Sequence, residues 1–164
     1  MNKIPIYSFV AYSGTGKTTL LEKLIIELKS RGFRVAVIKH DAHKLEIDRE
    51  GKDSWRFTNA GADVTILASI DKTAIMENRF VPLDTLLNKI TDVDIILTEG
   101  FKFGEWPKIA VCREAAGNQL PIPVENCFAI VTDIPQQTDK PCFDLDDVSS
   151  LADFIIKDMK QKYR

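Results

Sequence analysis

The chain has 164 residues, of which 45% are hydrophobic and 28% are charged, and its formal net charge is −2. This length predicts one domain, and a chain of this size can bury roughly 70% of the surface that its unfolded form exposes. Both charge signs are mixed along the chain, which argues against a protein held to nucleic acid by bulk electrostatic attraction. No apolar run is long enough to span a membrane.

The N-terminus and the cysteines indicate a cytoplasmic protein. Residues 1–5 lead directly into an expected strand and carry no signal-peptide pattern. Cys112, Cys127 and Cys142 are odd in number and include no C-x-x-C pair, which is typical of reduced thiols in the cytosol. We therefore expect the cysteines to be small core or strand residues.

The most informative stretch is the loop from Ala11 to Thr19. It follows the β-branched and aromatic run 6–10 and precedes leucines spaced as in an amphipathic helix, so it joins a strand to a helix. Gly16-Lys17-Thr18 lies at the helix start and matches the end of the phosphate-binding pattern G-x-x-x-x-G-K-[ST]. The alternative interpretation is an ordinary glycine-rich turn.

In a phosphate-binding loop each residue type has a physical role. Small residues let backbone N–H groups converge on an anion, and the helix N-terminus adds positive potential. We expect Lys17 to reach the β- and γ-phosphates and the Thr18 hydroxyl to bind Mg²⁺. The nucleotide-binding residues expected in the loop are Ser13, Gly14, Thr15, Gly16, Lys17, Thr18 and Thr19.

Ala11 stands where the pattern has its first glycine. If this position requires a positive φ, a Cβ costs about 1–2 kcal/mol. Such a cost corresponds to roughly a tenfold loss of affinity. On that condition, we expect phosphate binding to be weakened but not abolished.

The first helix is predicted over 17–30, with Gly32 at the position that favours a C-terminal glycine. The apolar run 34–39 follows as a second strand, and this order indicates a right-handed parallel βαβ unit. The next segment, 40–54, is crowded with charge and follows the carboxyl end of that strand, where such sheets bind ligands.

The later elements follow from the same patterns. Helices are predicted at 54–59, 82–90 and 148–160, and strands at 64–69, 73–76, 93–99, 108–113 and 127–132. The predicted fold class is α/β, a P-loop NTPase fold with a mostly parallel sheet flanked by helices. Residues 1–164 are expected to form a single P-loop nucleotide-binding domain.

A magnesium–nucleotide site usually includes a carboxylate, and the strand 93–99 offers Asp94 and Glu99. Five residues of extended chain place them roughly 16 Å apart, so only one can serve. Glu99 lies at the carboxyl end of the strand, on the same edge of the sheet as the phosphate loop. It is the expected metal ligand, either directly or through water. A surface turn carboxylate is the alternative, and Asp94 is expected to cap the strand in solvent.

Asp41 and the two histidines follow the second strand. Asp41 is a catalytic candidate, for Mg²⁺ or for positioning the water that attacks the γ-phosphate, and an exposed loop aspartate is the alternative. The spacing of His40 and His43 suggests a transition-metal site. Zinc sites usually have four ligands, however, and no cysteine pair lies nearby in the sequence. Hydrogen bonding to phosphate or to a partner ligand is the favoured role of the two histidines.

Guanine selectivity in many P-loop GTPases depends on a carboxylate within N-K-x-D, and that tetrad is absent. Thr132-Asp133, at the end of a late strand, can place a carboxylate for guanine on the edge of the sheet where the phosphate loop lies. A simple turn aspartate before Ile134-Pro135 is the alternative.

Assembled, these stretches resemble the MobB family, molybdopterin-guanine dinucleotide biosynthesis protein B. The likeness covers most of the chain, and K-H-D-x-H together with T-E-G-F-K is more specific than the phosphate loop. It rests on Ser13-Gly14-Thr15-Gly16-Lys17-Thr18-Thr19, Lys39-His40-Asp41-Ala42-His43, Asp48 with Gly51-Lys52-Asp53-Ser54, Ala60-Gly61-Ala62, Thr98-Glu99-Gly100-Phe101-Lys102, Pro107-Lys108-Ile109 and Thr132-Asp133.

The resemblance implies a GTP-binding accessory protein that uses GTP and Mg²⁺ and hydrolyses GTP weakly. It would act beside a MobA-type guanylyltransferase, which joins GMP to molybdopterin, and molybdopterin is a further candidate ligand. Similar proteins are homodimers in which a β-rich segment reaches across to the other subunit. Residues 64–81 and 108–113 are the candidates here.

Weak hydrolysis agrees with the residues, because no glutamine or arginine stands out as a water positioner or an arginine finger. A P-loop small-molecule kinase using ATP is the competing interpretation. Such a kinase needs an acceptor pocket and commonly an arginine-bearing lid, whereas the arginines here are scattered. A non-catalytic nucleotide-sensing adaptor is a third interpretation.

Overall fold

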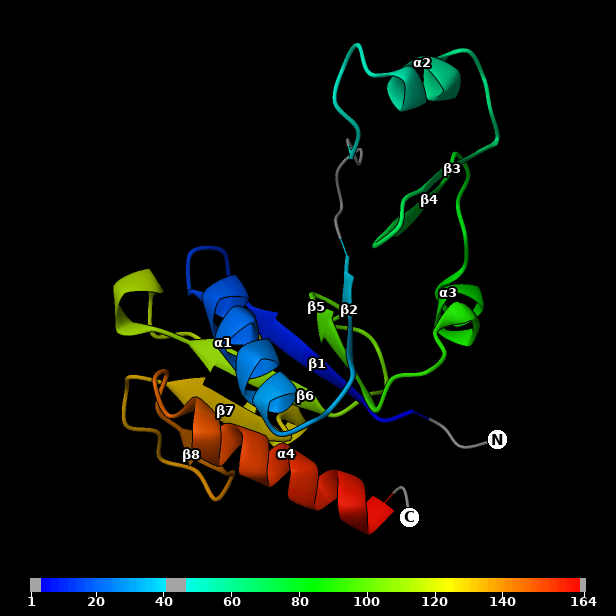
Figure 1. The fold of residues 1–164 in the computed structure, drawn as a ribbon. Helices are drawn as coiled ribbons and strands as arrows, with labels where there is room; N and C mark the ends of the chain where they lie inside the picture. The colour runs from blue at the N-terminus through cyan, green and yellow to red at the C-terminus, as the bar shows by residue number, and fades with distance from the viewer. Residues whose placement is uncertain (1–3, 41–46, 163–164) are drawn as a thin grey trace. The chain divides into compact units, whose positions relative to one another are not determined.

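The computed structural model describes residues 4–40 and 47–162 (Figure 1). The chain forms two compact units, one of Met1–Asp41 with Asp92–Arg164 and one of Ala42–Thr91. The first contains a six-stranded sheet and the second a two-stranded sheet. The predicted roles of Asp41 and His43 fall outside the described residues.

Six parallel strands form the sheet of the first unit, in the order β2-β5-β1-β6-β7-β8. They are β1 (Ile6–Ala11), β2 (Val35–Lys39), β5 (Ile95–Glu99), β6 (Lys108–Cys112), β7 (Ala129–Thr132) and β8 (Cys142–Phe143). The predicted parallel sheet is confirmed, and β8 is an addition, because so short a strand carries no readable periodicity. Since β5 and β6 flank β1, the carboxyl ends of all three lie at one edge.

Two helices, α1 (Lys17–Ser30) and α4 (Val148–Lys162), cover one face of this sheet and lie side by side (Figure 1). The predicted bounds of α1 are confirmed. Its buried leucines pack with Leu151 and Ile155 of α4 and with Phe9 and Leu97 of the sheet. This core fixes the start of α1 at the end of β1.

The opposite face of the sheet has a smaller core. Val10, Ala110, Cys127 and Ile130 are buried there, and Leu120, Ile122 and Val124 pack against them. These covering residues belong to the segment between β6 and β7, which includes the short 3₁₀ turns η1 (Glu114–Ala116) and η2 (Val124–Asn126). Both faces of β6 are therefore covered.

The expectation that residues 108–113 reach across to another subunit is wrong. The strand β6 lies between β1 and β7, and its backbone pairs with both of them. Residues 109–112 are also buried. This strand thus lies inside its own sheet, and neither side of its backbone is left unpaired for a strand of a second chain.

The cysteines are free thiols, as expected from their number. Cys112 is buried in β6 and Cys127 is buried beneath the segment that covers β7, while Cys142 is exposed in β8. Burial raises the pKa of the Cys112 and Cys127 thiols. Both therefore stay protonated at neutral pH and behave as small apolar core residues.

The second unit contains α2 (Asp53–Asn59), the antiparallel hairpin of β3 (Val64–Ala68) and β4 (Thr73–Glu77), and α3 (Leu83–Lys89). The predicted order of elements is confirmed. Ile66 lies opposite Ile75 in the hairpin, and the two are 60% and 63% exposed. Exposed apolar side chains grouped in this way are typical of an interaction surface.

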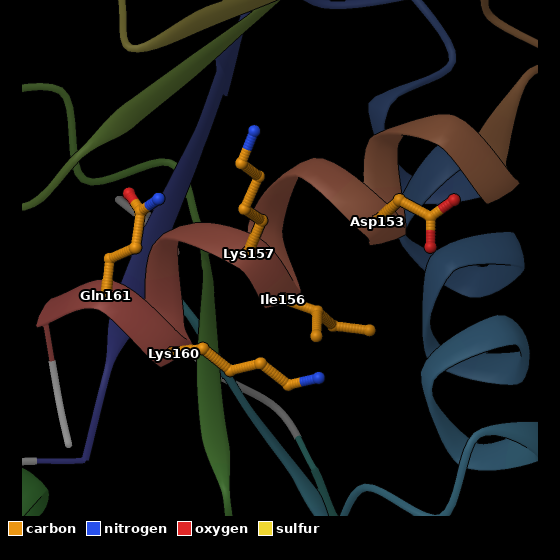
Figure 2. A pocket seen from close by; sticks show the side chains of 5 residues that line it. All are labelled: Asp153, Ile156, Lys157, Lys160 and Gln161. Carbon is orange, nitrogen blue, oxygen red and sulfur yellow. The ribbon is translucent and has the colours of Figure 1, made fainter.

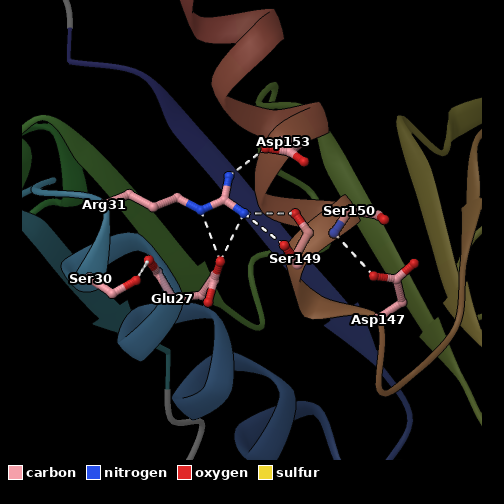
Figure 3. Close-up of polar contacts among 7 residues, drawn as sticks. All are labelled: Glu27, Ser30, Arg31, Asp147, Ser149, Ser150 and Asp153. Atoms are coloured by element: carbon pink, nitrogen blue, oxygen red, sulfur yellow. Dashed lines mark hydrogen bonds and ion pairs between the residues drawn. The ribbon is translucent and has the colours of Figure 1, made fainter.

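Arg31 joins the end of α1 to the start of α4 (Figure 3). Its guanidinium donates to Asp153 at 2.5 Å, to Glu27 at 2.9 Å and to the Ser149 hydroxyl at 2.9 Å. The bonds to Asp153 and Glu27 raise the pKa of Arg31 above its usual value. The pair of helices is thereby fixed at the end remote from Lys17.

Among the described residues, no helix combines the length and the apolar character that crossing a membrane requires.

Leu24 provides a direct test of the core beneath α1. It is fully buried, so Leu24→Ala is expected to lower the free energy of unfolding by about 2–5 kcal/mol. Ile26 on the same helix is 69% exposed, and Ile26→Ala is expected to change that free energy by less than about 0.5 kcal/mol. Urea denaturation followed by circular dichroism measures both, and equal losses would contradict this packing.

Candidate functional site

The loop between β1 and α1 has the backbone that its glycines allow. Gly14 and Gly16 have φ angles of 79° and 83°, a conformation that residues with a Cβ adopt at a cost. A Cβ on Gly14 would meet no atom within 4 Å, so the space beside the loop is open. On the inner side, the buried Thr15 hydroxyl donates to the Tyr12 carbonyl at 3.1 Å. The loop is thus held from within and open outside.

The start of α1 presents backbone donors. Gly16 is the N-cap residue of α1, and as a glycine it has no side chain that could cap the helix. The Leu20 amide donates to the Gly16 carbonyl at 2.9 Å, so the amides of Lys17, Thr18 and Thr19 precede the first helical hydrogen bond. Such donors at the positive end of a helix form an anion site, and phosphate is the usual ligand.

Ala11 does not strain this loop. It is the last residue of β1 and lies opposite Val111 in the parallel pair with β6. In the described part of the chain, Asp92 is the one residue other than glycine with a positive φ. The condition on which the expected loss of phosphate affinity depended is therefore not met.

Glu99 ends β5, the strand beside β1, and meets the first residues of α1. Its Oε1 accepts a hydrogen bond from the Thr18 hydroxyl at 3.2 Å and lies 3.5 Å from Lys17 Nζ. The side chains of Lys17 and Glu99 are 17% and 13% exposed, so their ion pair is largely shielded from water. Side chains predicted from two separate motifs, the phosphate loop and the strand 93–99, thus lie together.

The oxygens of Thr18 and Glu99 fit a magnesium ion. Mg²⁺ prefers hard oxygen ligands at 2.0–2.1 Å in an octahedron, in which neighbouring ligands are about 3 Å apart. The two side-chain oxygens are separated by 3.2 Å. Across the described residues, no group of three or more histidine, cysteine or acidic side chains is arranged so that it could hold a metal ion by itself. A metal here would complete its shell with phosphate oxygens and water, as magnesium does.

Asp94 and His40 have roles outside that cluster. The Arg34 amide donates to Asp94 Oδ2 at 2.6 Å, so Asp94 caps the far end of the sheet, as expected. The His40 amide donates to the Glu99 carbonyl at 3.0 Å, and its ring meets Phe101 edge-on at 5.1 Å. His40 therefore lies beside Glu99 in an aromatic contact.

Thr132 and Asp133 lie at the carboxyl end of β7, on the expected edge. The Thr132 hydroxyl accepts a hydrogen bond from the Ile134 amide at 3.1 Å. Asp133 Oδ1 accepts one from the Glu114 amide at 2.8 Å, and its Oδ2 lies 3.8 Å from Arg113 Nε. Each carboxylate oxygen of Asp133 therefore has a partner within the chain.

Arg113 is the residue that motif reasoning missed. A Cβ added to Gly16 would lie 3.5 Å from Arg113 NH1, so this guanidinium lies against the loop. The sequence motifs did not single it out, and the expectation that no glutamine or arginine acts as a water positioner or an arginine finger stays a prediction. The signal was available, because Arg113 is the last residue of the predicted strand 108–113 and parallel strands end at the same edge of a sheet.

Two hollows on the surface do not include any of these residues. One, of about 580 Å³, is lined by Asp153, Ile156, Lys157, Lys160 and Gln161, all on α4 (Figure 2). The lysine side chains extend in different directions there. The other, of about 690 Å³, is lined by residues of α2 and Ala60. Neither brings residues of several elements together, as a built ligand site does.

Comparison with known proteins agrees with this arrangement. Residues 6–133 match the family model MobB, described as Molybdopterin guanine dinucleotide synthesis protein B. A Molybdopterin-guanine dinucleotide biosynthesis adapter protein of Haemophilus influenzae is 44% identical over 158 residues, covering 94% of this chain and 89% of that protein. An Escherichia coli protein of the same name is 40% identical over 167 residues, covering 97% and 95%.

Solved structures share the fold. A crystal structure of molybdopterin-guanine biosynthesis protein B is 31% identical, with a TM-score of 0.71 and coverage of 93% of this chain and 98% of that one. A crystal structure of Bacillus subtilis MobB is 28% identical, with a TM-score of 0.73 and coverage of 93% and 96%. The parallel sheet is thus of the P-loop NTPase type, and the chain belongs to the MobB family.

Proposed function

We propose that this chain is a GTP-binding accessory protein of molybdenum cofactor biosynthesis, which assists the attachment of GMP to molybdopterin to form molybdopterin guanine dinucleotide. The observation that carries the proposal is the meeting of Lys17, Thr18 and Glu99 at the start of α1. The names of the relatives, adapter proteins of molybdopterin-guanine dinucleotide biosynthesis, support the pathway.

In this proposal the loop residues Ser13, Gly14, Thr15, Gly16, Lys17, Thr18 and Thr19 bind the phosphates of GTP. Backbone amides at the start of α1 donate to phosphate oxygens, and the Lys17 ammonium contacts the β- and γ-phosphates. Thr18 and Glu99 hold Mg²⁺. The ion, when bound, neutralises negative charge on the phosphate oxygens.

The Lys17–Glu99 pair supports a coupling between nucleotide and metal. In the absence of ligand, the ammonium and the carboxylate neutralise each other in a partly shielded site. When Lys17 contacts phosphate instead, Glu99 is left beside several negative charges, which is unfavourable at low exposure. A divalent cation removes this repulsion. We therefore expect GTP and magnesium each to strengthen the binding of the other.

For base recognition we propose Thr132 and Asp133, whose carboxylate can accept from the N1–H and amine of guanine. For hydrolysis we propose Lys17 and Asp41, with Asp41 binding the metal or positioning water. The support for Asp41 is its position in the sequence, two residues after Lys39, the last residue of β2. We propose that turnover is weak and that the main role is binding.

We also propose a cytoplasmic homodimer that works with a MobA-type guanylyltransferase, with molybdopterin as a further ligand. The hairpin within residues 64–81 supports the dimer, because it exposes Val64, Ile66, Leu67 and Ile75 by 43% to 63%. Because side chains alternate along a strand, Val64, Ile66 and Ile75 lie on one face of the hairpin, and exposed apolar residues grouped in this way mark an interface. A second copy of the same hairpin offers matching apolar chemistry.

Lys17→Ala tests the nucleotide site. Loss of a shielded cation from the phosphates is expected to weaken GTP binding about 100-fold. Lys29→Ala, on the exposed side of the same helix, serves as the control and should bind as the unmodified protein does. Calorimetric titrations with GTP and with ATP measure the effect. Unchanged GTP affinity would contradict the role of Lys17, and tight ATP binding with phosphate transfer to an acceptor would favour a kinase.

Glu99→Gln tests the metal site. The amide keeps the size of the side chain but loses the charge, so the gain in GTP affinity on adding Mg²⁺ should fall about 10- to 100-fold. Affinity without magnesium should hold or rise, since Lys17 is no longer paired. Glu22→Gln on the exposed side of α1 is the control. A full magnesium effect in Glu99→Gln would mean that another group binds the ion.

Ile75→Asp tests the dimer. A charge at this exposed cross-strand position should convert the dimer to a monomer in light scattering after size-exclusion chromatography. Ile26→Asp places the same charge at an equally exposed isoleucine of α1 and should leave the dimer intact. A monomeric starting protein, or a dimer that survives in Ile75→Asp, would exclude this interface.

A further inference from the structure

Arg113 lies beside the phosphate loop, close to the start of α1. It directly follows β6, which pairs with β1 on one side and with β7 on the other. Its NH1 group is 3.5 Å from the position that a Cβ on Gly16 would occupy. Gly16 is the residue that precedes the open amides of α1. The guanidinium therefore stands beside the same anion site that the amides form.

The donors of Arg113 are largely unused in the described part of the chain. A guanidinium has five N–H donors. Within the described residues Arg113 forms one ion pair, with Asp133, in which Nε lies 3.8 Å from Oδ2, farther than a hydrogen bond reaches. Arg31, by contrast, makes several bonds of 2.5–3.2 Å and is half as exposed, at 24% against 46%. Arg31 is therefore a structural arginine, and Arg113 is not held in that way.

Asp133 is held by one oxygen and faces Arg113 with the other. Its Oδ1 accepts from the Glu114 amide at 2.8 Å, which fixes the carboxylate, whereas Oδ2 has only the long contact to Arg113. A phosphate offers a guanidinium two oxygens at once and more negative charge than one carboxylate. Transfer of Arg113 from Asp133 to a phosphate is thus favourable, and it leaves Oδ2 open to an N–H donor.

We propose, building on the GTP-binding function above, that Arg113 binds a phosphate of the nucleotide and thereby releases Asp133 Oδ2 to accept a guanine N–H. Arg113 then couples the two ends of the ligand. The chain would read the base well only when the phosphates are present. A nucleoside without phosphates would meet an Asp133 that is still paired with Arg113.

Arg113→Ala separates this role from a structural one. We expect GTP and GDP to bind about 10- to 100-fold more weakly. Guanosine should bind as before or more tightly, because Asp133 is no longer paired. Arg113→Lys keeps the charge without the planar fork and should give a smaller loss. Asp133→Ala should relax the preference for GTP over ATP while retaining the preference for GTP over guanosine.

Arg34→Ala is a matched control. Arg34 is exposed and its Nε lies 3.8 Å from Asp94 Oδ2, the same distance as in the Arg113 pair, but at the opposite edge of the sheet. The Arg34→Ala variant should bind GTP, GDP and guanosine with the affinities of the unmodified protein. Calorimetry gives the affinities, and thermal unfolding without ligand verifies that each variant is folded.

The outcomes separate this inference from the function on which it rests. Loss of GTP and guanosine binding by equal factors in Arg113→Ala and Arg113→Lys would mean that Arg113 only supports the fold, and unchanged GTP affinity would mean that it does not contact phosphate. Either result overturns the inference about Arg113 and leaves the proposed GTP-binding function standing. If the unmodified protein binds neither GTP nor ATP, the proposed function falls and this inference falls with it.

Discussion

The contact of Glu99 with Lys17 and Thr18 is the constraint on which the site depends. It exists because β5 pairs directly with β1, with Glu99 opposite Phe9, so that the carboxylate reaches the start of α1. The leucine face of α1 and the apolar strands hold that helix start in place. In the proposed function, a phosphate takes the place of Glu99 beside Lys17, and magnesium takes the place of Lys17 beside Glu99.

The strand order gives the two sides of the loop different chemistry. On the β5 side stand the oxygens of Thr18 and Glu99, which suit a magnesium ion. On the β6 and β7 side stand Arg113 and Asp133, which suit a phosphate and a guanine base. In the proposed function, a nucleotide along this edge has Thr18 and Glu99 at one end and Arg113 and Asp133 at the other.

Much of the first unit could be predicted, because the phosphate loop, the leucine spacing of α1 and the apolar strands are strong local patterns. Glu99 could be placed at the site since parallel strands end at one edge. Arg113 was missed because the motifs end before it, and only the neighbouring strand brings it to Gly16. The φ of Ala11, the pairing of β6 on both sides and the two-residue β8 depend on long-range contacts that local patterns do not record.

A crystal structure with a non-hydrolysable GTP analogue and Mg²⁺ tests the central claim most directly. The account predicts phosphates against the amides of 14–19 and Lys17, the ion at Thr18 and Glu99, and the guanine edge at Asp133. A fully occupied analogue bound elsewhere on the chain, with the Lys17–Glu99 ion pair still closed, would contradict it.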